Sequence, residues 1–282
     1  FIRGGWGHFY QTQGIHEISV TDGEEDFHGA ELAEHRVIGV DHYFEQGIHL
    51  RLEGYYKKVS DLRPQYRNWI GGVEIFPELQ RDRVKVTFDD ATAKGMELYL
   101  KNEMWEKLTW WASYALADST YRLRSYAPPN RGPEAEIMFN DDLPGFYDQR
   151  HAFYFDINYR PRPLLHINLA WQYRSGWPHT GKVLKEVILE DGTTGFYTEA
   201  GEPHGERFPA FHRMDVRVSR DFNTSMGRIT AFFEIMNLYN RGNISHYSYY
   251  LWRDDESSAP YMVKTPEKSF GLLPSIGVTW TW

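Results

Sequence analysis

Apolar and polar side chains alternate along much of this chain with a period of two, which is the pattern of a β-strand whose two faces meet different surroundings. Residues 151–160 show it well, because every second side chain is apolar. Applied along the whole chain, the same test predicts ten strands and an all-β fold. The predicted strands are 2–11, 35–45, 48–60, 93–104, 108–120, 149–160, 164–176, 211–222, 227–239 and 271–282.

The connections between these strands alternate strictly between short and long. The short ones are 45–47, 105–107, 161–163 and 223–226, and the long ones are 12–34, 61–92, 121–148, 177–210 and 240–270. In an antiparallel meander this alternation places every long connection at the same end. Outer-membrane barrels have short periplasmic turns and long extracellular loops, whereas a soluble sandwich has no such asymmetry. The pattern therefore favours a transmembrane antiparallel β-barrel.

Aromatic side chains collect on the apolar faces near the short-turn end of the predicted strands. Barrels carry such girdles where the membrane meets water. The residues that predict a lower girdle are Phe44, Trp110, Tyr159, Phe222, Trp280 and Trp282.

Composition is compatible with this interpretation. Phe, Trp and Tyr make up 16% of the 282 residues, and no run of 18 apolar residues predicts a membrane helix. A mean hydropathy of −0.60 does not decide the matter, since a barrel alternates lipid-facing and lumen-facing residues. A soluble β-sandwich or propeller remains the alternative. The absence of cysteine excludes disulfides and thiolate sites, and the net charge of −8 disfavours nucleic-acid partners.

The chain opens Phe1-Ile2-Arg3-Gly4 with neither an initiator Met nor a signal-peptide pattern, so we expect it to be part of a longer protein. Ten strands could also close a small barrel by themselves.

Several segments resemble TonB-dependent outer-membrane receptors. The fairly specific ones are 233–240, where a strand runs into Asn237-Leu238-Tyr239-Asn240, and 274–282, a last strand that ends on an aromatic. Looser likenesses lie at 5–11 and 33–39. The resemblance implies that residues 1–282 are the C-terminal wall segment of a 22-stranded barrel, with plug and earlier strands outside the chain. It also implies that Trp280 and Trp282 form the signal read by the barrel-assembly machinery.

The implied function is TonB-energised uptake of a scarce nutrient: a ferric siderophore, haem, cobalamin, an oligosaccharide or a peptide. The expected partners are outer-membrane lipid, a plug domain of the same polypeptide and the TonB complex, and no cofactor is expected. A plug-less pore or an adhesin barrel, or a soluble β binding module, remains an alternative.

Ligand contacts are expected in the long loops, because function concentrates on loops that a rigid scaffold carries. The candidates are aromatic and basic residues: Tyr66, Arg67, Trp69, Trp177, Phe196, Tyr197, Tyr249 and Trp252.

Charged side chains on the polar faces of the strands are expected to line the lumen. Their mixed sign suits contact with a plug surface, although a wet lumen without a plug would also accept it. These residues are Arg51, Glu53, Glu97, Asp156, Arg174, Asp215, Arg217 and Glu234.

The sequence contains no convincing enzymatic constellation, and we predict no catalytic or metal-binding residue. Acidic pairs at 89–90, 141–142 and 254–256 could hold Ca²⁺ but are more simply read as solvated loop charges. An outer-membrane protease would need acids beside His212, and no second acidic pair is found there.

Overall fold

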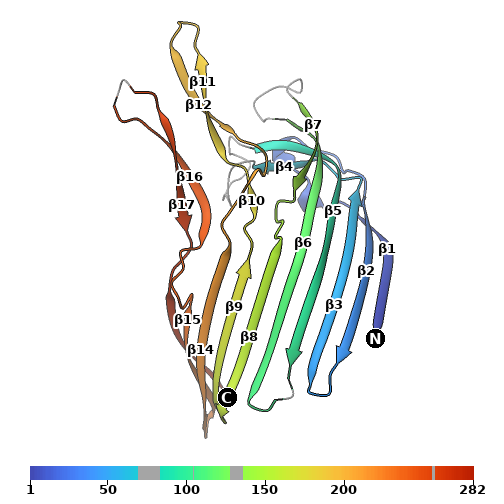
Figure 1. The fold of residues 1–282 in the computed structure, drawn as a ribbon, viewed down its shortest axis with the longest axis vertical. Coiled ribbons are helices and arrows are strands. Elements are labelled where there is room, and N and C mark those ends of the chain that lie inside the picture. The colour runs from blue at the N-terminus through green and yellow to red at the C-terminus, as the bar shows by residue number, and fades with distance from the viewer. Residues whose placement is uncertain (69–82, 104, 128–135, 256–257) are drawn as a thin grey trace.

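Ten long strands form one curved antiparallel sheet in the computed structural model, which describes residues 1–68, 83–103, 105–127, 136–255 and 258–282 (Figure 1). Each strand pairs with the next long strand along the chain, so the predicted up-and-down meander is confirmed. The strands are β1 (Ile2–Gln11), β2 (Glu31–Tyr43), β3 (Ile48–Ser60), β5 (Arg83–Asn102), β6 (Leu108–Ala127), β8 (His151–Arg162), β9 (Leu165–Arg174), β14 (Phe211–Thr224), β15 (Gly227–Met236) and β18 (Leu273–Thr281).

The long connections lie at one end of the sheet and contain short elements that the alternation test did not find. Two hairpins, β11–β12 and β16–β17, project from this end (Figure 1). The elements are η1 (Ile15–Glu17), η2 (Val20–Asp22), β4 (Gln65–Asn68), β7 (Ile137–Pro144), β10 (Pro178–His179), β11 (Lys182–Ile188), β12 (Thr194–Ala200), β13 (Glu206–Arg207), β16 (Ile244–Trp252) and β17 (Tyr261–Lys268). Within the described ranges, no helix is long and apolar enough to cross a membrane.

The register joins the apolar positions of neighbouring strands into continuous rows. Residues that pair across two strands share a face of the sheet. One such row runs across six strands through Val40, Leu52, Leu98, Tyr114, Phe153 and Tyr173. Many apolar side chains on this face are open, for example Ile38 at 64% and Val278 at 70% exposure. A face of this kind suits contact with hydrocarbon, and we call it the outward face.

Two of the four short turns are tighter than the sequence predicts. Arg162 still pairs with Leu165, so the predicted link 161–163 reduces to Pro163 and Leu164, and Leu164 adopts a positive φ of 66°. Likewise Thr224 pairs with Gly227, which leaves two residues in that turn. Gly227 has a φ of 119°, a backbone conformation that residues with a Cβ rarely adopt.

β5 and β6 extend well beyond the predicted strands at the long-loop end. Their register shifts between Phe88 and Ala91, and again between Leu123 and Ser125. Such bulges change which residues face a given side, so the period of two breaks at residues 89–90 and the prediction stopped short. As a result of the bulges, the side chains of Val84, Val86 and Phe88 lie on the same face of the sheet as Leu123.

These four side chains form a buried apolar cluster at the outer ends of β5 and β6, and they dominate the buried hydrophobic residues of the described chain. β4 continues along one edge of β5, and β7 along the opposite edge of β6. Phe139, Leu143 and Phe146 pack against the cluster from the connection that contains β7. The outer part of the sheet thus has a small core of its own, of the kind found in water-soluble proteins.

Replacing Leu123 by Ala is expected to destabilise this outer cluster by about 2–5 kcal/mol, since Leu123 is fully buried and would leave a cavity. Limited proteolysis of the full-length protein should then cleave the segment around β7 faster, while the barrel keeps its resistance to unfolding in detergent. Leu52→Ala, on the outward face, is the matched control and should leave loop cleavage unchanged. Equal cleavage of both variants would contradict a separate outer core.

Candidate functional site

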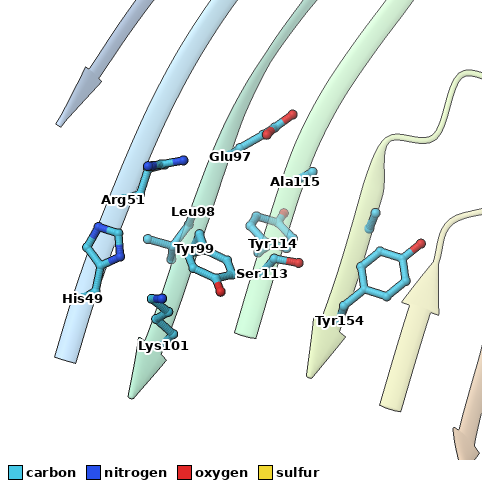
Figure 2. A pocket seen from close by; sticks show the side chains of 11 residues that line it. His49, Arg51, Glu97, Leu98, Tyr99, Lys101, Ser113, Tyr114, Ala115 and Tyr154 are labelled. Atoms are coloured by element: carbon cyan, nitrogen blue, oxygen red, sulfur yellow. The ribbon is translucent and has the colours of Figure 1, made fainter. Parts of the chain in front are cut away.

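The polar face of the sheet, opposite the outward face, carries an open hollow of about 560 Å³ across β3, β5, β6 and β8 (Figure 2). Small side chains form its floor, because Ala115 pairs with both Glu97 and Ala152 while Ser113 pairs with Tyr99 and Tyr154. Aromatic and basic side chains form its border, including Tyr99, Tyr154, Arg51 and Lys101. The hollow is therefore recessed at the centre, where the side chains are small, and amphipathic at the edge.

A buried ion cluster lies beside this hollow. Asp41 is 2% exposed, and its Oδ1 accepts hydrogen bonds from His49 Nε2 and Arg51 Nε, both at 3.0 Å. Its Oδ2 lies 3.0 Å from Arg3 Nη1, and Arg3 Nη2 donates to Glu53 at 2.7 Å. Tyr43 stacks on the His49 ring with centroids 4.1 Å apart. The buried charge of Asp41 is thus compensated by arginines from β1 and β3, so these pairs add to the register of the first three strands.

The eight residues predicted to face a plug all lie on this polar face by register. Glu53 and Glu97 pair across β3 and β5, and Asp156 accepts two hydrogen bonds from Asn168 Nδ2 at 3.0 and 3.1 Å. Arg217 lies 3.6 Å from Glu234, with its guanidinium 3.8 Å from the ring centroid of Phe232. Whether a plug covers them stays a prediction.

Other residues predicted to face a plug also contact neighbouring side chains. Arg51 pairs with Asp41, and Asp215 accepts hydrogen bonds from Arg213 and from the backbone of Asn237. Arg174 lies over the ring of Phe211 at 4.4 Å. Several of the wall's charges are thus neutralised within the wall itself, so a surface packed on it would meet an electrostatically balanced lining.

The structure separates the predicted ligand-contact residues into three places. Tyr66 and Arg67 lie in β4 near the outer core, where Arg67 stacks on Phe146 at 4.4 Å. Trp177 contacts Tyr147, and Tyr249 lies near Lys182 and Lys264 at the bases of the projecting hairpins. Phe196, Tyr197 and Trp252 lie on the hairpins themselves. Trp69 lies outside the described residues. They do not meet in one site, and their ligand contacts stay a prediction.

Two outer loops meet in an aromatic and ionic junction that the sequence did not reveal. His179 packs on Phe208, with ring centroids 4.3 Å apart, and Phe208 stacks on Tyr247 at 5.5 Å. Lys264 lies 4.1 Å from the Tyr247 ring centroid and pairs with Glu206. The junction couples the segment of β10–β13 to the hairpin β16–β17, so movement of one would displace the other.

A corner of buried asparagines anchors the last outer loop to the sheet. Asn237 is 1% exposed with a positive φ of 55°. Its side chain accepts from Arg241 N at 3.0 Å and donates to Arg241 O at 2.9 Å. Asn243 bonds both backbone groups of His212 at 3.1 Å. Asparagine suits this corner because it tolerates left-handed backbone and has both a donor and an acceptor.

The acidic pairs have protein partners where the chain is described. Asp89 pairs with Arg124, Asp142 lies 3.4 Å from Arg122, and Asp254 accepts from Tyr261 Oη at 3.1 Å. No group of three or more metal-binding side chains occurs among the described residues.

The two C-terminal tryptophans lie at the short-turn end of β18. Their rings are 5.6 Å apart, and Trp280 Nε1 donates to Met226 O at 3.1 Å. Trp282 is 90% exposed, so its ring is open to a partner. Recognition by the assembly machinery stays a prediction.

Changing Asn237 to Ala is expected to lower the free energy of unfolding by about 2 kcal/mol or more, because it removes three side-chain hydrogen bonds from a buried corner. Urea unfolding of the full-length protein in detergent micelles would measure the loss. Asn237→Gly should recover part of it, since Gly accepts the left-handed backbone. Asn223→Ala, at an exposed position of β14, should be neutral, and a loss as large there would contradict the role of the corner.

The contact between the outer loops at His204 is expected to weaken in acid. Burial lowers the pKa of His204 below 6.5, the charges of Arg67 and Arg207 lower it further, and the bond of Nδ1 to Pro144 O (2.6 Å) opposes them. The packed loops thus favour neutral His204, whereas opened loops bind the proton more readily. The contact should be fully stable above about pH 6.5 and weaken as pH falls towards the lowered pKa.

Hydrogen exchange of residues 136–148, corrected for the intrinsic effect of pH, would measure this change. His204→Asn, whose amide can still donate near Pro144, should remove the pH dependence. A variant that keeps the same pH dependence would assign it to another group.

Comparison with known proteins places the fold. No family model and no curated protein matches the sequence. Among solved structures, the chain is similar to the FrpB iron transporter of Neisseria meningitidis, with 11% identity, 98% of this chain covered and a TM-score of 0.52. It is also similar to the outer membrane transporter YddB of Escherichia coli, with 7% identity, 99% covered and a TM-score of 0.54. The chain spans 36% and 38% of the lengths of those proteins. The chain therefore has an all-β antiparallel fold like that of part of these outer-membrane proteins, as the sequence resemblance implied.

Proposed function

We propose that this chain is the C-terminal wall segment of a TonB-dependent receptor in a Gram-negative outer membrane, which takes up a scarce nutrient and is not an enzyme. The observation that carries the proposal is the ten-strand meander with all long loops at one end and a continuous outward apolar face. The likeness to an iron transporter and to an outer membrane transporter supports it. Because the chain spans little more than a third of those proteins, the plug and the contact with TonB belong to the proposal.

The wall contributes two surfaces to such a receptor. Its polar face is a balanced lining with an open hollow, against which a plug domain can pack through hydrogen bonds and water. Its outer loops form a coupled layer, in which aromatic side chains of the two projecting hairpins are open to solvent. These hairpins are the surfaces from which a ligand contact would begin.

The cargo class follows from what aromatic and basic side chains recognise. Aromatic rings stack on planar groups and sugars, and cations pair with carboxylates or phenolates. Ferric siderophores and haem combine planar and anionic groups, which suits the rings of Trp177, Tyr197, Tyr249 and Trp252. Cations lie beside two of these rings, since Lys182 and Lys264 lie over Tyr249 and Arg174 lies over Trp177. Cobalamin, oligosaccharides and peptides remain further members of the proposed class.

Planar-bilayer recording on the full-length protein tests the receptor proposal. A plugged receptor should be nearly silent, and loosening the plug with urea should open a large conductance that closes again on removal of urea. A steady conductance of the untreated protein would identify a plug-less pore instead. Failure to insert into the bilayer, together with solubility without detergent, would identify a soluble β module.

A second experiment measures uptake by cells that express the full-length protein and tests whether this uptake requires energy. Uptake of ferric siderophores or haem should stop when TonB is deleted or the proton-motive force is dissipated. TonB-independent uptake would contradict an energised receptor.

A further inference from the structure

A cluster of basic side chains occupies the outward face at the outer ends of β2, β3, β5 and β6 and on the segment that leads into β8. We call it the basic patch, and it consists of Arg36, Lys58, Lys94, Arg122 and Arg150.

The register fixes the direction of the basic patch. Arg36 pairs with Tyr56, and Tyr56 pairs with Lys94. Two residues further along the same strands, Ile38 and Met96 belong to the exposed apolar face. Residues two apart in a strand point to the same side, so Arg36 and Lys94 face outward about 7 Å beyond the apolar row. That distance corresponds to the transition from hydrocarbon to headgroups.

A tryptophan, Trp6, lies at the same height along the strands as Arg36, with which it pairs. Trp6, which is 68% exposed, donates from Nε1 to Glu34 Oε1 at 2.8 Å, and Arg36 Nη2 lies 2.8 Å from the same oxygen. Tryptophan favours the boundary between membrane and water, where its ring can be apolar and its N–H can bond. The basic patch therefore begins at the interface and extends away from the hydrocarbon.

The acids of the patch lie deeper than its cations. Each basic side chain has an acidic neighbour, yet the cations are 45–63% exposed, and all except Arg122 are more exposed than their partners. Asp118 shows the arrangement, since it lies 3.4 Å from Lys94 and 2.8 Å from Arg150 while remaining 28% exposed. The acids hold the cations in place, and the cations present the outermost charge.

The patch is confined to one part of the wall. At comparable outward positions, β9, β14 and β15 carry Tyr173, His212 and Ile235, whereas Arg174 and Arg213 at the same ends belong to the polar face by register. A general preference for the interface would spread the charge around the wall. A local cluster instead suits a localised anionic group.

We propose that the basic patch binds the phosphate groups of anionic lipids in the outer leaflet, which rests on the outer-membrane location proposed above. Guanidinium groups match phosphate oxygens through paired hydrogen bonds, and ammonium groups add point charges. The occupant is a lipid because the patch is continuous with the apolar face, so one molecule can place acyl chains on Ile38 and Met96 and a phosphate among the cations.

Nanodiscs test the proposal with the full-length protein. The protein is reconstituted in phosphatidylcholine mixed with lipid A, and lipids retained after mild detergent extraction are identified by mass spectrometry. Lipid A should be enriched over phosphatidylcholine, and the enrichment should fall as salt rises. The triple variant R36Q/K94Q/R122Q should lose about fivefold of the enrichment for each cation removed, by analogy with basic residues at anionic membrane surfaces.

The matched control is R174Q/R217Q, which removes basic charge from the polar face and should retain the wild-type enrichment. Equal loss in both variants, or enrichment of lipid A that is insensitive to salt, would overturn the proposal. If the triple variant does not fold, dephosphorylated lipid A offered to the wild-type protein replaces it, and unchanged enrichment would then be the contradicting result. Uptake and conductance are measured separately, so a failure here is distinct from a failure of the receptor proposal.

Discussion

The pairing of backbone N–H and C=O groups across neighbouring strands is the constraint on which the rest of this structure depends. In hydrocarbon, an unpaired backbone group costs several kcal/mol, about the stability of a small domain when a few are added. Each inner strand of the meander therefore pairs on both sides along its length. β1 and β18 have one neighbour each in this sheet, so in a membrane their free edges would have to be paired. The two-sided register that follows decides which side chains meet lipid and which meet the interior.

That register also explains how a polar interior can be stable. Alternate residues must face inward, and in the wall they include acids and bases close together. Pairing Asp41 with His49 and Arg51, or Arg217 with Glu234, lowers the cost of keeping these charges on the polar face. The same pairs cross neighbouring strands, so they add to the register that placed them there.

The membrane part of the fold could be predicted from the sequence because the two faces of each strand differ so strongly in polarity. The polarity of each strand residue, for example apolar Phe153 or charged Asp156, indicates which face of the sheet its side chain occupies. The outer region could not, since its hydrophobic cluster depends on bulges at 88–91 and 123–125 that break the period, and its hairpins mix apolar and polar residues on both sides. The junction at His179 and the corner at Asn237 depend in part on contacts between residues far apart in the chain, such as Phe208 with Tyr247 and Asn237 with Phe270. No local sequence pattern predicts such contacts. For the same reason, the sequence could not indicate that the predicted ligand-contact residues lie in separate places.

The asparagine corner has a consequence for how such a protein can change over evolutionary time. Asn237, Asn240 and Asn243 tie the two ends of the last outer loop together, through bonds that include Asn240 to Leu272 and Ser269 to Asn243. The hairpin β16–β17 therefore starts and ends at a base that these hydrogen bonds close. Insertions, deletions or wholesale exchange of that hairpin should therefore leave the ten-strand sheet undisturbed, which gives the outer-loop surface freedom to diverge while the sheet stays constant.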